Sequence, residues 1–115
     1  MNALPDPITR VDAEQALRLA RQTLDIELGA INGLKSRLDD TFVQALQAMF
    51  DVRGRVVVMG MGKSGHIGRK VAATLASTGT PAQFVHTGEA IHGDLGMIRG
   101  DDLLLVLSNS GESDE

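Results

Sequence analysis

The stretch RVVVMGMGKSGH, residues 55–66, decides the fold class of this chain. It opens with a short β-branched run that ends in glycines, which is typical of a strand buried on both faces in a parallel sheet. A helix is predicted next, because apolar residues recur at helical spacing between Ser64 and Ser77, and Gly79 and Pro81 then supply a stop. Strand, glycine loop and helix predict the first half of a βαβ unit.

Two further strands are predicted downstream. Residues 82–85 form the second, and residues 103–107 are interpreted as a third buried strand that runs directly into a serine-rich loop. Three short apolar strands separated by crossover-length segments predict the α/β class, with an open, mostly parallel sheet flanked by helices. The chain stops where the next helix should begin, so we expect residues 55–115 to be the first βαβαβ part of an incomplete domain.

Residues 1–54 are predicted to form a helical region that precedes the sheet. Thr9 and Asp12 resemble a capping box at the start of a long amphipathic helix. A second helix is expected to begin at residue 39 or 40 and to stop at Gly54. The first helix carries an apolar stripe at helical spacing, formed by Leu17, Ala20, Leu24, Leu28 and Ile31.

The composition limits what the chain can bind. Its 115 residues, 43% hydrophobic and 23% charged, form one small domain or part of a larger one, with no cysteine for disulfides or thiolate chemistry. A net charge of −4 and only three aromatic residues disfavour nucleic acid as a partner. The longest apolar runs are far shorter than the roughly 20 residues of a membrane helix. We therefore expect a cytoplasmic protein without nucleic-acid or membrane partners.

The glycine loop at residues 60–66 is the first candidate site. Free backbone N–H groups at a helix start stabilise anions, and glycines let a ligand approach the backbone closely. Gly60, Gly62 and Gly65 match the G-x-G-x-x-G pattern, but the acid expected after the next strand is missing, and a Walker A loop would need glycine where Val57 stands. The alternative is that these glycines serve only the tight packing of strand and helix.

The serine loop, Ser108-Asn-Ser-Gly-Glu-Ser113, is the second candidate site. Its hydroxyls, its glycine and the N-terminus of a new helix would form a neutral hydrogen-bonding cup for one phosphate group. Alternatively, it is an N-cap followed by a turn. Ligands of open α/β sheets bind outside the carboxyl ends of strands, where both loops are expected. Two such loops at one edge favour a phosphorylated ligand.

Three segments together resemble the SIS (sugar isomerase) domain of bacterial arabinose-5-phosphate isomerases. They are GMGKSGHIGRKVAATLASTGTPA at residues 60–82, FVHTGEAIHGDLGMI at 84–98 and LSNSGESDE at 107–115. The resemblance implies a SIS or flavodoxin-like fold and the interconversion of D-arabinose 5-phosphate and D-ribulose 5-phosphate through an enediol, feeding the Kdo sugar of lipopolysaccharide. It also implies a small phosphorylated sugar as substrate and no required cofactor. One departure is Thr87, where members often have proline.

The resemblance also assigns roles to individual residues. Lys63 matches the family's catalytic lysine and Glu115 its catalytic glutamate, whereas Glu112 is interpreted as a first-turn helix residue. The alternative for Lys63 is a solvated surface lysine. The positions that match substrate contacts are Gly62, Ser64, Gly79, Thr80, His86, His92, Ser108, Asn109, Ser110, Gly111 and Ser113.

Two pairs among these positions have simpler interpretations. His86 also matches a zinc-binding position, which makes zinc at His86 a further expectation, although the enediol chemistry requires no metal. Without the resemblance, His86 and His92 would be read as ordinary loop histidines, since no third ligand is in sight. Gly79 and Thr80 would be read as a helix C-cap followed by proline.

The resemblance bears on assembly and on completeness as well. Members assemble as homotetramers, so we expect a homo-oligomer, with the N-terminal helix either at its interface or in an intramolecular core. Members also continue through more of the sheet, so the activity of residues 1–115 alone stays open. Two other functions remain as alternatives, a non-catalytic phosphosugar-binding SIS module and a related hexulose-phosphate isomerase.

Overall fold

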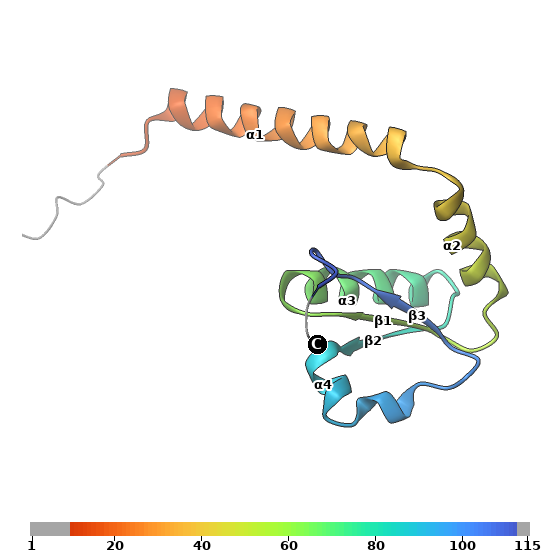
Figure 1. Ribbon diagram of the computed structural model, residues 1–115. Coiled ribbons are helices and arrows are strands. Elements are labelled where there is room, and N and C mark those ends of the chain that lie inside the picture. Colours follow the sequence, from red (N-terminus) through yellow and green to blue (C-terminus); the bar gives the residue numbers. More distant parts are fainter. Residues whose placement is uncertain (1–9, 113–115) are drawn as a thin grey trace, which may run out of the picture. The chain divides into compact units, whose positions relative to one another are not determined.

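The computed structural model describes residues 10–112 of the chain (Figure 1). The chain divides into two compact units, Met1–Thr41 and Phe42–Glu115. No helix within the described residues combines the length and the apolar character that crossing a bilayer requires. In chain order, the elements are α1 (Ala13–Gly33), the 3-10 helix η1 (Leu34–Arg37), α2 (Asp40–Asp51), β1 (Val56–Gly60), α3 (Gly62–Ser77), β2 (Ala82–His86), α4 (Thr87–Ile91), the 3-10 helix η2 (Asp94–Met97) and β3 (Leu103–Val106).

Helix α1 is the long amphipathic helix that the sequence predicts. Asp12 caps it, since the Asp12 carboxylate accepts a hydrogen bond from the Gln15 N–H at 3.1 Å. Asp12 is therefore the N-cap itself and not the second member of a capping box begun by Thr9, which lies outside the described residues. No residue of α1 is buried, and its apolar stripe is exposed at Leu17 (55%), Leu24 (63%), Leu28 (63%) and Ile31 (63%).

Helix α2 begins at the predicted position, because the Asp39 carboxylate accepts a hydrogen bond from the Thr41 N–H at 2.9 Å. The helix ends at Asp51, before the predicted stop at Gly54. A different constraint explains this glycine, since a Cβ there would lie 2.8 Å from the carbonyl oxygen of Asp101. Glycine at position 54 therefore allows the loop before β3 to lie close to the segment between α2 and β1.

Three parallel strands form the sheet, in the order β2-β1-β3. The central strand is β1, because Val56 pairs with Ala82 of β2 on one side and with Leu103 of β3 on the other. All five residues of β1 are buried, as expected for a strand that is covered on both faces. The predicted parallel α/β sheet is confirmed.

Helices cover both faces of β1. Because alternate side chains of a strand point to opposite sides, the buried residues of β1 divide between these two faces. Two buried clusters result, namely Val56, Val58 and Ala72 beneath α3, and Val57, Met59, Val85 and Ala90 beside α4. Met49 and Val52, at the end of α2 and just after it, pack against the first cluster. Full burial of one valine side chain stabilises a fold by roughly 1.5–3 kcal/mol, so the valines of β1 contribute strongly to stability.

Strand β3 differs from the predicted buried strand. Leu103 and Leu105 pack against the cluster beneath α3, whereas Leu104 and Val106 are 46% and 59% exposed. The strand lies at the edge of the sheet, and nothing in the described part of the chain covers these two side chains. The prediction of full burial is therefore wrong for β3 within residues 10–112, since an apolar run does not reveal whether a helix lies over it.

Glycines let α3 approach the sheet closely. A Cβ at Gly68 would lie 2.9 Å from Cε2 of Phe84, and a Cβ at Gly65 would lie 3.0 Å from the carbonyl oxygen of Gly60. Tight strand–helix packing therefore explains Gly60 and Gly65. It does not explain Gly62, because no atom lies within 4 Å of the position that its Cβ would take.

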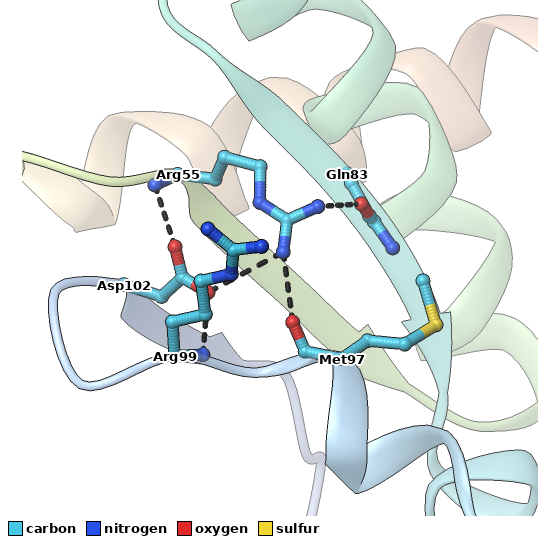
Figure 2. Close-up of polar contacts among 5 residues, drawn as sticks. All are labelled: Arg55, Gln83, Met97, Arg99 and Asp102. Atoms are coloured by element: carbon cyan, nitrogen blue, oxygen red, sulfur yellow. Dashed lines mark hydrogen bonds and ion pairs between the residues drawn. The ribbon is translucent and has the colours of Figure 1, made fainter.

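A polar network fastens the amino-terminal ends of the strands (Figure 2). The Asp102 side chain is 1% exposed, and its carboxylate accepts hydrogen bonds from the backbone N–H groups of Arg55 and Arg99, both at 2.8 Å. The Arg55 guanidinium lies 3.5 Å from this carboxylate and also donates to the Gln83 side chain and the Met97 carbonyl. The two backbone hydrogen bonds, helped by the charge of Arg55, lower the pKa of Asp102.

Replacing Asp102 with Asn is expected to destabilise the fold. The amide offers one acceptor oxygen where the carboxylate offers two, so one of the two backbone N–H groups loses its acceptor. Because the pKa of Asp102 is lowered in the folded state, its carboxylate stabilises the fold above the unfolded-state pKa and loses that contribution as the pH falls through the folded-state value. Urea unfolding should therefore show the difference between wild type and Asp102→Asn shrinking below about pH 4.

The exposed neighbour provides the control for this measurement. Asp101→Asn leaves the network intact, since the Asp101 side chain takes no part in it. Equal urea midpoints for the two variants at neutral pH would mean that the network does not stabilise the fold.

Candidate functional site

A pocket of about 880 Å³ lies at the carboxyl edge of the sheet. It brings together the two loops that the sequence singles out, the glycine loop after β1 and the serine loop after β3. The residues that line it are Met61, Gly62, Lys63, Ser64, Thr87 and residues 106–111.

The strand order explains why the two loops meet. The carboxyl ends of parallel strands lie at one edge of a sheet, and β3 pairs directly with β1. The chain leaves β1 through α3 toward β2 and later returns to the opposite side of β1 as β3. A crevice forms where strand order reverses in this way, and open α/β sheets bind their ligands there.

The glycine loop presents an open helix N-terminus to this pocket. Gly62 begins α3 with a φ of +55°, and Met61 before it makes no side-chain capping bond. The first backbone N–H groups of α3 are therefore left for an anion. Lys63 is exposed, and among the described residues that line the pocket it is the one with a charged side chain. It forms no ion pair with any described residue. The pocket thus carries a local positive charge.

The serine loop is held in shape by its own hydroxyl groups. Ser108 Oγ accepts a hydrogen bond from the Gly111 N–H at 2.8 Å, and Ser110 Oγ accepts one from the Glu112 N–H at 3.1 Å. Gly111 has a φ of +71°, which permits the tight return of the chain. Each hydroxyl keeps its own proton to donate, so the loop offers donors to an anion. Ser113 and Glu115 lie outside the described residues.

His86 is turned toward its own backbone. Its Nδ1 accepts a hydrogen bond from the Gly88 N–H at 3.0 Å and so caps α4. In the neutral ring the proton is therefore on Nε2. His92 follows α4 and is exposed. Neither histidine is among the residues that line the pocket, and contact of either with substrate stays a prediction.

The described residues do not fit a zinc ion at His86. Coordination through Nε2 requires the ring proton on Nδ1, which would break the bond from the Gly88 N–H. No group of three or more His, Cys, Asp or Glu side chains with the spacing of a metal site occurs within residues 10–112. We therefore assign no step of the chemistry to a metal at this position.

Gly79 and Thr80 lie at the other end of α3, before β2 begins. Gly79 has a φ of +102°, and the Thr80 N–H donates to the Leu75 carbonyl at 2.9 Å, which closes the C-terminal turn of the helix. The helix that separates them from Gly62 is roughly 24 Å long at 1.5 Å per residue. A C-cap accounts for the local conformation of both residues, neither of which is among the described residues that line the pocket, and their contact with substrate stays a prediction.

The pocket also contains residues that the sequence analysis did not select, of which Thr87 is the polar one. Thr87 immediately follows β2, so the rule that selected the two loops, the carboxyl end of a parallel strand, points to it as well.

The SIS domain family matches residues 49–115. The arabinose 5-phosphate isomerase KdsD of Pseudomonas aeruginosa is 56% identical over 96 residues, covering 84% of this chain and 29% of the relative. The arabinose 5-phosphate isomerase GutQ of Escherichia coli K12 is 55% identical over 103 residues, covering 90% of this chain and 32% of the relative. The chain thus spans less than a third of the length of these relatives.

A solved structure agrees with these matches. The structure of E. coli CFT073 c3406 in complex with A5P has a TM-score of 0.85 and 42% sequence identity, covering 90% of this chain and 55% of that chain. Because the family match covers more than half of the residues and runs through both loops of the pocket, this chain belongs to the SIS domain family.

Proposed function

We propose that this chain supplies the sugar-phosphate site of an aldose–ketose isomerase that interconverts D-arabinose 5-phosphate and D-ribulose 5-phosphate. One observation carries the proposal: two loops whose donors suit an anion share one pocket in a chain that is 55–56% identical to proteins named arabinose 5-phosphate isomerase. The complex of c3406 with A5P supports a phosphorylated sugar as the ligand. The names of these relatives favour this function over a hexulose-phosphate isomerase or a binding-only module.

The phosphate group fits the side of the pocket between β1 and β3. Its oxygens can accept hydrogen bonds from the hydroxyls of Ser108 and Ser110, and from Ser64, Asn109 and the backbone of the loop. The uncapped first N–H groups of α3, with the positive end of the helix dipole, add further attraction. Because backbone bonds already hold both serine hydroxyls, binding orders little of the loop.

Lys63 is the proposed electrostatic catalyst. Proton transfer between C1 and C2 passes through an enediol, and the negative charge that develops on oxygen must be stabilised. The Lys63 ammonium forms no ion pair with any residue from 10 to 112, so it is available for this oxygen or for the phosphate. A preorganised charge in such a position contributes most when the charge develops in the transition state.

The proton itself requires a base. The resemblance assigns this role to Glu115, and the lining residues that the structure describes include no carboxylate. We keep Glu115 as the proposed acid and base. One carboxylate and one cation provide what an enediol reaction needs, so the proposal contains no required cofactor.

The proposal extends to the setting of the reaction. A charged sugar phosphate does not cross a lipid bilayer unaided, which supports a cytoplasmic location. The names of the relatives support a role in supplying the Kdo sugar of lipopolysaccharide. The exposed apolar stripe of α1 supports a homo-oligomer, a tetramer by family resemblance, in which α1 packs against other copies of the chain.

The activity can be measured in two proteins. One is the chain of residues 1–115, and the other is a chimera in which this chain replaces the matching segment of P. aeruginosa KdsD. We expect the chimera to form ribulose 5-phosphate from arabinose 5-phosphate. Turnover in neither protein would contradict the catalytic proposal and leave only binding. Turnover of a six-carbon ketose phosphate instead would favour a hexulose-phosphate isomerase.

Replacing Lys63 with Met is expected to lower the kcat of the active protein about 100-fold or more, because it removes the cation that stabilises the enediolate. Lys70→Met provides a matched control, since Lys70 is an exposed lysine of the same helix outside the pocket. Equal kcat values for the two variants would contradict the assignment of Lys63.

Replacing Ser108 with Ala is expected to weaken the binding of inorganic phosphate about 10- to 150-fold, because one hydrogen bond to an anion contributes about 1.5–3 kcal/mol. Ser108→Thr keeps the hydroxyl and should restore much of the affinity. Ser36→Ala, a substitution in η1, serves as the control. Calorimetry that finds the same phosphate affinity for Ser108→Ala and wild type would exclude the serine loop from the phosphate site.

Sedimentation can test the interface assigned to α1. Leu24→Glu combined with Leu28→Glu introduces two charges into the apolar stripe, and we expect a folded monomer where wild type is an oligomer. Gln22→Glu, on the opposite side of the helix, should leave the mass unchanged. A monomeric wild type, or a double variant that keeps the wild-type mass, would contradict the proposal. Loss of helical circular dichroism in the double variant would instead indicate an intramolecular core.

A further inference from the structure

The pocket has two chemically different sides. The serine loop follows β3 and Thr87 follows β2, with β1 between them, so the two sides lie roughly 10 Å apart at the strand spacing of 4.7–4.9 Å. The donors suited to a phosphate, namely the first N–H groups of α3 and the serine hydroxyls, belong to β1 and β3. On the β2 side, the described lining offers Thr87, which carries no charge.

This asymmetry orients an elongated sugar phosphate. The dianionic phosphate binds where positive charge and several donors are present, on the side of β1 and β3. The uncharged end of the sugar then extends past β1 toward β2. That end carries C1 and C2, the two carbons whose oxygens change between carbonyl and hydroxyl during the isomerisation.

The side chain of Thr87 suits this end of the sugar. Thr87 is half-buried, and its hydroxyl makes no hydrogen bond with any residue between 10 and 112. The neighbouring His86 directs its Nδ1 to the Gly88 N–H and not to this hydroxyl. A hydroxyl both donates and accepts, so it can donate to the C1 oxygen when that oxygen is the aldehyde and accept from it when it is an alcohol. A carboxylate can only accept, so it could bond to the alcohol but not to the aldehyde without first taking up a proton.

We infer that Thr87 is a specificity-determining residue that binds the C1 oxygen of the sugar phosphate, at the opposite end of the pocket from the phosphate. This inference rests on the proposed function and deepens it. The carboxyl ends of all three parallel strands then contribute to recognition. The residues after β1 and β3 bind the phosphate, and Thr87 after β2 binds the reacting end of the sugar.

The test compares two ketose phosphates on the 115-residue chain. D-Ribulose 5-phosphate carries the C1 oxygen and 1-deoxy-D-ribulose 5-phosphate lacks it, while inorganic phosphate reports on the phosphate side alone. We expect wild type to bind the 1-deoxy compound about five-fold more weakly than ribulose 5-phosphate, the loss that one uncharged hydrogen bond gives. Thr87→Val, which keeps the shape and removes the hydroxyl, should bind the two equally, and Thr87→Ser should restore the discrimination. Phosphate affinity should stay the same in all three proteins.

The possible results separate this inference from the proposed function. If wild type binds ribulose 5-phosphate but Thr87→Val discriminates as wild type does, the inference is wrong and the proposed function stands. If Thr87→Val loses phosphate affinity equally, Thr87 shapes the pocket and does not read C1, which also overturns the inference. If wild type binds phosphate but neither ketose phosphate, or none of the three, the proposed function fails and the inference fails with it. Circular dichroism of each variant confirms that the comparison is made between folded proteins.

Discussion

The burial of β1 is the constraint on which the rest of the second unit depends. Val56–Gly60 is paired on both edges and covered on both faces, so its direction and register determine where β2 and β3 can lie. Because both neighbours run parallel to β1, the loops after the strands emerge at one edge. The pocket is therefore a consequence of the way an apolar pentapeptide is buried, and the two polar loops line one pocket only because of it.

The amino-terminal end of the sheet holds a stabilising polar network, and the carboxyl end holds the candidate site. At the amino-terminal end, the Asp102 carboxylate has its partners in Arg55 and Arg99, and Arg55 also holds Gln83 and Met97. At the carboxyl end, the first amides of α3 have no side-chain cap and Lys63 has no counter-ion among the described residues. Groups without partners at one end can serve a ligand because satisfied groups at the other end maintain the strands.

Much of this arrangement could be predicted from local sequence signals. A β-branched run, glycines after it and a helical period identify β1 and α3, and parallel pairing alone predicts that the loops at Gly60 and Ser108 share an edge. Properties that depend on distant neighbours could not be predicted. The exposure of Val106 depends on what covers an edge strand, and the need for glycine at position 54 depends on the loop near Asp101. The inward turn of the His86 ring is set by the Gly88 N–H, and a list of candidate ligands cannot reveal such a bond.

The central claim is that the loops after β1 and β3 bind one sugar phosphate together. An NMR titration of the ¹⁵N-labelled chain with D-arabinose 5-phosphate tests it most directly, through the amide signals of residues 62–64 and 108–111. The account predicts that both groups of signals shift together and follow one dissociation constant. Shifts confined to one loop, or two clearly different dissociation constants, would contradict it.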